Sequence, residues 1–227
     1  ELKITPLGGI TNQTLRLQHP KIDAVLRLPG SASAPMIHRW QEALHQRIAA
    51  LAGIALPPLW SEPSSGRRLT PYLPHHRAPS PTPISLEDLN RVGALLGRVH
   101  RLKGSFQGIK TPEAIASAYG ATLRELGAAL PEAYPQALAI FEGILKTIAL
   151  APWPLGPSHM DPSLANVLLS PGGAPDDDYL IDWEFSGVAS PAWDVAIVAL
   201  EASLNIEDTA QLLGAAGLPP GPGPRAR

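Results

Sequence analysis

Three polar residues that could take part in catalysis lie in one short stretch of the sequence. The stretch SHMDPSLAN contains His159, Asp161 and Asn166, and the apolar run VLLS follows it directly. There is no room for a helix between these residues, so we expect a loop that leads into a strand. In such a loop Asp161 could accept the proton of an attacking hydroxyl group. We expect His159 to brace the loop by hydrogen bonding rather than to carry a proton.

Another acidic residue, Asp182, ends the next apolar run. The turn-forming sequence PGGAPDDD separates VLLS from YLID, and this order predicts a hairpin. Because antiparallel strands run back along each other, the hairpin would return Asp182 to the side of Asn166. A carboxylate and an amide oxygen side by side suit Mg²⁺, which keeps phosphate oxygens in its remaining positions. The consecutive acids at 176–178 are expected to form a solvated bend instead of a metal site.

Each of these residues also has an ordinary structural explanation. Asp161 precedes a proline and could be a turn residue. Asn166 could be a polar group at a strand edge, and His159 a buried histidine with its hydrogen bonds satisfied. The catalytic interpretation therefore depends on what the rest of the chain provides.

Two features near the N-terminus fit the binding of phosphate. Gly8 and Gly9 lie between expected strands in LGGITNQT, where missing side chains let backbone N–H groups approach phosphate oxygens. Arg27 interrupts an apolar strand and needs an anion or a buried partner. Glu42, on the polar side of the following helix, could be that partner and hold Arg27 toward the phosphates. Taken singly, these residues could equally be a hairpin turn, an exposed arginine and a solvated glutamate.

The elements that must position these residues are strands first and helices afterwards. Short strands are expected within residues 2–28, and one or two more within 56–73. Between them the spacing predicts a helix over 35–51. Its expected apolar face consists of Ile37, Trp40, Leu44, Ile48 and Leu51.

The second half of the chain has helix signals. Ser85 is a candidate N-cap, and Thr111 precedes a proline at a second helix start. The segregation of strands from helices predicts an α+β protein with a sheet-rich N-terminal lobe at 1–73, a Pro-rich connector at 74–84 and a helical lobe at 85–227. The expected buried stripes are Leu89, Val92, Leu96 and Val99 in one helix, and Leu138, Phe141, Leu145 and Ile148 in another.

The composition and charge of the chain indicate which kind of molecule it binds. The chain has 227 residues, 44% of them hydrophobic, which is enough for a sizeable core. A formal net charge of −2 gives no basic face for nucleic acid or a membrane surface, so a small molecule is the expected partner. The chain has no cysteine, no apolar run of the roughly 18 residues that a membrane span needs, and no signal-peptide pattern. We therefore expect a cytoplasmic protein.

Taken together, these motifs resemble those of the choline/ethanolamine kinase and aminoglycoside phosphotransferase superfamily, and bacterial choline kinases most of all. The resemblance covers residues 7–196 and rests on SHMDPSLAN, VLRLPG around Arg27, RWQE at 39–42 and IDWEFSGVASPAWDVA at 181–196. It implies a bilobal protein-kinase-like fold with a small antiparallel sheet and a helix in the N-terminal lobe. It also implies ATP and Mg²⁺ as cofactors, Asp161 as catalytic base, Asn166 and Asp182 as metal ligands, and Asp194 as a brace for the catalytic loop.

The resemblance further implies where the substrates bind. Arg27 would take the place of the usual phosphate-binding lysine, and the adenine would meet backbone groups near residues 70–73. Choline or ethanolamine is the implied acceptor, with thiamine or an aminoglycoside as alternatives. Trp183, Glu184 and Phe185 are candidates to contact its cationic group. The implied nucleotide-binding residues are Gly8, Gly9, Asn12, Arg27, Glu42, Thr70, Tyr72 and Leu73.

The chain departs from the family pattern at its end. Relatives continue for several helices beyond the one that carries Asp194, whereas this sequence ends in GLPPGPGPRAR. A C-terminally shortened fold is therefore expected, with a substrate pocket that lacks part of its wall. The alternative function is that of a nucleotide-binding, non-catalytic kinase-like module or fragment.

Overall fold

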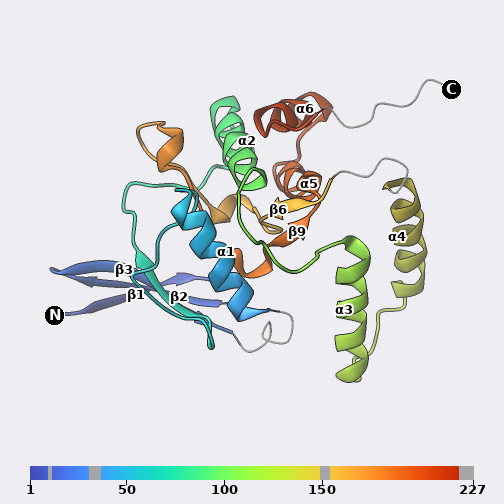
Figure 1. The fold of residues 1–227 in the computed structure, drawn as a ribbon, viewed down its shortest axis with the longest axis horizontal. Coiled ribbons are helices and arrows are strands. Elements are labelled where there is room, and N and C mark those ends of the chain that lie inside the picture. Colours follow the sequence, from blue (N-terminus) through green and yellow to red (C-terminus); the bar gives the residue numbers. More distant parts are fainter. Residues whose placement is uncertain (10–11, 31–36, 149–153, 220–227) are drawn as a thin grey trace.

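Residues near the N-terminus form a five-stranded antiparallel sheet in the order β1-β2-β3-β5-β4 (Figure 1). A computed structural model of the chain describes residues 1–9, 12–30, 37–148 and 154–219. The register of β3 and β5 places Arg27 directly opposite Arg68. The strands are β1 (Lys3–Gly8), β2 (Asn12–His19), β3 (Ile22–Pro29), β4 (Trp60–Glu62) and β5 (Arg67–Pro71).

Helix α1 (Arg39–Leu51) lies beside this sheet, and its buried face differs from the predicted one (Figure 1). The predicted apolar stripe was wrong at Trp40 and Leu51, which are 63% and 83% exposed, whereas Ile37 is buried and the other two positions are partly buried. The buried positions are Glu42, His45, Gln46 and Ala49. Polar groups can be buried only with partners, so this face must meet charged or hydrogen-bonding groups from elsewhere in the chain.

Helix α2 (Leu86–His100) forms the centre of the main hydrophobic core, as its periodicity predicts. Ser85 caps it by accepting a hydrogen bond from the backbone N–H of Asp88 at 3.1 Å. The predicted stripe of α2 is buried, and α5 (Pro191–Glu201) and α6 (Ile206–Ala215) pack nearby. A Cβ at Gly93 would lie 2.5 Å from the Cβ of Ala215, so glycine is what lets α2 and α6 approach this closely. The core around α2 includes Leu89, Val92, Leu96, Val99, Leu164, Leu180, Trp183, Val195 and Leu212.

Two further helices lie to one side, away from the sheet (Figure 1). Helix α3 (Pro112–Glu125) begins at the predicted cap, where Thr111 accepts from the N–H of Ala114 at 3.3 Å, and none of its residues is buried. Helix α4 (Tyr134–Ile148) carries the second predicted stripe. That stripe is only partly covered, because Leu138 is 39% exposed, and the side chain of Ile148 lies outside what the structure describes.

Short strands connect these helices to the candidate catalytic residues. Strand β6 (Gly156–Ser158) pairs with β9 (Gly187–Ala189), and β7 (Val167–Leu168) pairs with β8 (Tyr179–Leu180). The second pair is the predicted hairpin. Turns of 3-10 helix cover Leu164–Asn166, Pro175–Asp177 and Trp183–Phe185.

The acidic turn of this hairpin is a solvated bend only in part. Asp176 and Asp177 are exposed, but Asp178 is 1% exposed and forms an ion pair with Arg91 of α2 at 2.5 Å. Asp178 also accepts a hydrogen bond from the backbone N–H of Ser170 at 2.9 Å. The prediction was therefore wrong for Asp178, which fastens the hairpin to α2.

The architecture is that of a bilobal α+β protein, as the order of elements predicts. One lobe contains the five-stranded sheet and α1, and the other contains the remaining helices and the two short strand pairs (Figure 1). Among the described residues, no helix has both the length and the apolar character needed to cross a bilayer.

Candidate active site

The loop that carries Asp161 is held by hydrogen bonds to α5 and to the segment that follows β8. The carboxylate of Asp194 on α5 accepts from the backbone N–H groups of His159 at 2.9 Å and Met160 at 2.8 Å. His159 Nε2 donates to the carbonyl oxygen of Ile181 at 3.0 Å, and its ring packs edge-on against Trp183. Burial lowers the pKa of His159 to about 4, so this histidine is neutral near pH 7. Both residues thus lie where the sequence analysis expected loop-bracing groups.

Asp161 lies at the end of this loop, and its pKa is higher than that of an ordinary aspartate. Its side chain is half-buried, and burial raises its pKa to about 6, with the carboxylate of Asp182 acting in the same direction. Asn166 Nδ2 donates to the backbone oxygen of Asp161 at 2.9 Å and to its Oδ2 at 3.2 Å. The amide N–H groups of Asn166 are therefore directed at Asp161, which leaves its amide oxygen for another ligand.

Asp182 reaches the same place through the β7–β8 hairpin. The backbone N–H of Ile181 donates to the carbonyl oxygen of Asn166 at 2.9 Å, so the two segments are in direct contact. Asp182 has a left-handed backbone conformation with φ 63° and ψ 68°. Non-glycine residues rarely adopt this conformation, although aspartate does so more often than most.

The donor set fits a hard divalent cation. Asp182 Oδ1 is buried and accepts no hydrogen bond from the described residues, although the guanidinium of Arg27 lies 3.2 Å away. The amide oxygen of Asn166 is the neighbouring candidate ligand. Carboxylate and amide oxygens are ligands that Mg²⁺ accepts, and Mg²⁺ completes its shell with water or phosphate oxygens.

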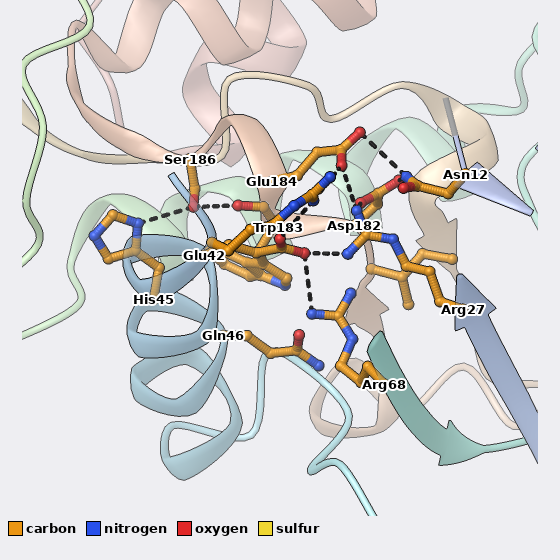
Figure 2. Close-up of polar contacts among 12 residues, drawn as sticks. Asn12, Arg27, Glu42, His45, Gln46, Arg68, Asp182, Trp183, Glu184 and Ser186 are labelled. Atoms are coloured by element: carbon orange, nitrogen blue, oxygen red, sulfur yellow. Dashed lines mark hydrogen bonds and ion pairs between the residues drawn. The ribbon is translucent and has the colours of Figure 1, made fainter. Parts of the chain in front are cut away.

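Behind Asp182 lies a buried group of three guanidinium and three carboxylate side chains, here called the charge cluster. Arg27 contacts both Glu42 and Glu184 (Figure 2). Arg68 lies 3.2 Å from Glu42. The cluster consists of Arg27, Arg39, Arg68, Glu42, Asp182 and Glu184, and it joins β3, α1 and β5 to the turn after β8.

Within this cluster Arg27 and Glu42 stabilise each other's charged form, whereas burial outweighs the ion pairs at Asp182, whose pKa is raised, and at Arg68, whose pKa is lowered. Burial lowers the pKa of Arg27, but the carboxylates of Asp182, Glu42 and Glu184 outweigh that effect and raise the pKa overall. Burial likewise raises the pKa of Glu42, and Arg27 and Arg68 reverse the shift. Glu42, Asp182 and Glu184 lie close enough together to hold a metal ion. Because the Arg27 guanidinium contacts all three carboxylates, we assign the position between them to that arginine and not to a metal ion.

A cavity of about 820 Å³ opens in front of the charge cluster. Gly9, at its edge, has φ 127°, and a Cβ there would lie 2.0 Å from the carbonyl oxygen of Asn12, so only glycine fits. Of the predicted nucleotide-binding residues, Glu42 alone does not line this cavity, because it is buried behind Arg27. The predicted residues that do line it are Gly8, Gly9, Asn12, Arg27, Thr70, Tyr72, Leu73, Asp161, Asn166 and Asp182.

Two predicted substrate contacts are in positions that do not suit that role. Trp183 is 0% exposed and donates from Nε1 to the carbonyl oxygen of Leu180 at 3.0 Å, so its ring belongs to the core. Glu184 is 4% exposed and is ion-paired with Arg27 and Arg39. Neither side chain can meet a substrate without rearrangement of the charge cluster or the core.

Sequence reasoning missed two sets of residues around this site. Arg68 was not predicted, although its place in the strand RRLTP pairs it with Arg27 once the sheet order is known. A second cavity, of about 450 Å³, lies beside Met160 and Phe185 and is lined largely by α3. Met160, Phe185 and Trp193 belong to the motifs quoted above, but no motif marks the residues of α3, which only the tertiary fold brings beside them.

Comparisons with known proteins show the family and the fold of the chain. Residues 3–226 match the phosphotransferase enzyme family. Protein LicA of Haemophilus influenzae is 28% identical over 212 residues, which cover 91% of this chain and 60% of that protein. The chain thus spans about three-fifths of the length of this curated relative.

Solved structures show the same fold. A choline/ethanolamine kinase family protein from Mesorhizobium loti matches with a TM-score of 0.74 and 27% identity, over 95% of this chain and 69% of the other. The choline kinase LicA from Streptococcus pneumoniae matches with a TM-score of 0.83 and 20% identity, over 95% and 75% of the two chains. By its sequence match and its kinase-like α+β fold, the chain belongs to the phosphotransferase enzyme family.

Proposed function

We propose that this chain transfers the γ-phosphate of ATP to the hydroxyl group of a small amino alcohol, with choline and ethanolamine as the first candidates. One observation carries the proposal: Asp161, Asn166 and Asp182 line the same cavity as the Gly8–Gly9 turn and Arg27. A base, two oxygen ligands for a cation and a phosphate-binding surface are what phosphoryl transfer requires.

In this proposal ATP occupies the larger cavity. The backbone of residues 70–73 meets the adenine, and Gly8, Gly9, Asn12 and Arg27 bind the phosphates, with Glu42 holding Arg27 from behind. A LicA structure with a TM-score of 0.80 and 20% identity is a complex with AMP. We propose the corresponding division of the chain into a nucleotide lobe at 1–73, a connector at 74–84 and a catalytic lobe at 85–227.

The chemical step follows from the positions of the side chains. Asn166 and Asp182 would hold Mg²⁺, which when bound would neutralise the charge of the phosphates. Asp161 accepts the hydroxyl proton while the acceptor oxygen forms a bond to the γ-phosphorus, and the bond from that phosphorus to the ADP oxygen breaks. With its pKa near 6, Asp161 is ionised at neutral pH and suits the role of a general base.

The names of the relatives support an amino alcohol as acceptor. They include choline kinase LicA and, with a TM-score of 0.76 and 16% identity, an ethanolamine kinase from Plasmodium vivax. An aminoglycoside phosphotransferase matches with a lower TM-score of 0.63. Phosphorylation of thiamine or an aminoglycoside is the alternative within the family, and a nucleotide-binding module without catalysis is the alternative outside it.

An ADP-release assay with Mg-ATP tests the proposal against both alternatives. We expect release that depends on choline or ethanolamine, and release that depends only on thiamine or an aminoglycoside would replace the acceptor. Calorimetric binding of Mg-ATP without release for any acceptor would favour the non-catalytic module. We also propose that the protein acts in the cytoplasm, where ATP and Mg²⁺ are available.

A further inference from the structure

The cavity of about 450 Å³ lies next to the proposed base but on the other side of the loop from the nucleotide cavity. Met160 lines it and directly precedes Asp161, which lines the nucleotide cavity. Phe185 lines both cavities and therefore forms part of the wall between them. If the proposed function holds, this is where the acceptor alcohol binds.

The wall of this cavity is mostly apolar and aromatic. Tyr119, Phe185 and Trp193 contribute rings, and the faces of such rings attract cations. Lys110 is the one charged side chain among the described residues that line it. The one formal charge among these residues is therefore positive, which is unexpected for a site that would receive a cationic substrate.

The position of Lys110 is fixed by its neighbours. Its backbone N–H donates to the carbonyl oxygen of Val188 at 2.9 Å. A Cβ at Gly187 would lie 2.6 Å from Lys110 Cγ. Glycine at the start of β9 therefore leaves room for the aliphatic part of the Lys110 side chain. Lys110 is half-buried, and burial lowers its pKa without any opposing carboxylate among the described residues.

We infer that Lys110 is a specificity-determining residue of the acceptor cavity and that it selects against alcohols with a fixed positive charge. The inference rests on the proposed function. A like charge in a half-buried wall repels a quaternary ammonium group more strongly than a ring face attracts it. Uncharged alcohols are therefore the favoured acceptors. Ethanolamine is a cation near neutral pH, but its nitrogen can lose a proton and that of choline cannot, so ethanolamine is disfavoured less than choline.

Two alcohols of equal shape but different charge separate the effect of charge repulsion from that of size. In 3,3-dimethylbutan-1-ol a carbon atom replaces the quaternary nitrogen of choline, so the two compounds differ in charge and little in size. We measure their binding by competition in ligand-observed NMR, which needs no turnover, and their phosphorylation by initial rates with Mg-ATP. The unaltered chain should bind the uncharged alcohol at least as tightly as choline.

Replacing Lys110 tests its role directly. Lys110→Met keeps the stem that packs on Gly187 and removes the charge, and Lys110→Gln is a second variant of the same kind. Both should tighten choline binding about tenfold and leave the uncharged alcohol within about twofold. Lys103→Met is the matched control, because it removes the same charge from an exposed lysine outside this cavity, and it should change neither affinity.

The outcomes separate this inference from the proposed function. An unchanged ratio of the two affinities in Lys110→Met, or a preference for choline in the unaltered chain, would overturn the role of Lys110 and leave the proposed function standing. Binding of neither compound to any variant, with thiamine or an aminoglycoside phosphorylated instead, would overturn the proposed acceptor class itself.

Discussion

His45 of α1 donates a hydrogen bond from Nδ1 to Ser186 Oγ across 3.0 Å (Figure 2). The tautomer is fixed because the backbone N–H of Gln107 donates to Nε2 of the same ring at 2.9 Å. Ser186 Oγ in turn donates to the carbonyl oxygen of Trp183 at 2.6 Å, and the His45 ring stacks on Phe106. A polar residue of α1 thereby fixes the turn that follows Asp182.

Removal of this contact should loosen Asp182. Ser186→Ala eliminates the hydroxyl group that links His45 to the turn, so the left-handed backbone of Asp182 loses part of its support. We expect the free energy of unfolding to fall by about 1–2 kcal/mol and the Kd for Mg-ATP to rise severalfold. Urea denaturation and calorimetry measure the two effects, and Ser105→Ala, at an exposed serine, is the control. An unchanged Kd would show that the turn is held by other contacts alone.

The same histidine should make the stability of the protein depend on pH. Burial lowers the pKa of His45 to about 4, and the Lys110 ammonium acts in the same direction. Below about pH 6.5 the unfolded chain therefore binds a proton that the folded chain does not, so stability is lost as the pH falls toward 4. Between pH 7 and 4.5 this one group should cost about 2 kcal/mol.

His45→Gln separates this titration from all others. Both chains share every other titrating group, so the difference between their unfolding free energies should shrink as the pH falls from 7 to 4.5. Denaturant melts at several pH values measure that difference. A constant difference across the range would mean that His45 does not carry the predicted shift.

Asp161→Asn should separate catalysis from binding. The substitution keeps the shape of the side chain and removes its ability to accept the hydroxyl proton. We expect acceptor-dependent turnover to fall by at least about a hundredfold, while the Kd for Mg-ATP stays nearly the same. Initial rates and calorimetry provide the two values, and turnover near that of the unaltered chain would exclude Asp161 as the base.

Asp182→Asn should affect the metal instead. The substitution removes a ligand charge next to Asn166, so nucleotide binding should require a higher Mg²⁺ concentration. The double variant with Asp176→Ser and Asp177→Ser is the control, because both residues lie in the exposed part of the hairpin turn. Titration of Mg²⁺ at fixed ATP compares the variants, and a loss of Mg²⁺ affinity in the control would move the metal site to the turn.

Local signals were enough to predict several elements of this structure. The cap at Ser85 and the spacing of the apolar residues after it predict α2, because both depend only on neighbouring residues. The turn sequence before Tyr179 predicts the β7–β8 hairpin for the same reason, and with it the meeting of Asn166 and Asp182. These two elements lead directly to the candidate site.

Local signals could not predict the residues that are buried because of a charged partner far away in the sequence. The face of α1 with Glu42 is buried because Glu42 forms ion pairs with Arg27 and Arg68 of the sheet. The spacing of apolar residues along the sequence cannot predict such a contact. Asp178 is buried for a similar reason, since Arg91 neutralises it. A partner far away in the sequence decides whether an acidic residue faces water, so only the fold could identify these positions.

The charge cluster also limits how the two lobes can move. Its arginines belong to the lobe that contains the sheet, and two of its carboxylates, Asp182 and Glu184, belong to the other lobe. Pulling buried ions apart would leave charges without partners in a medium of low polarity. We therefore expect any rotation between the lobes to have its axis near Arg27, so that the cleft widens mainly at its far rim and nucleotide exchange leaves the inner wall in place.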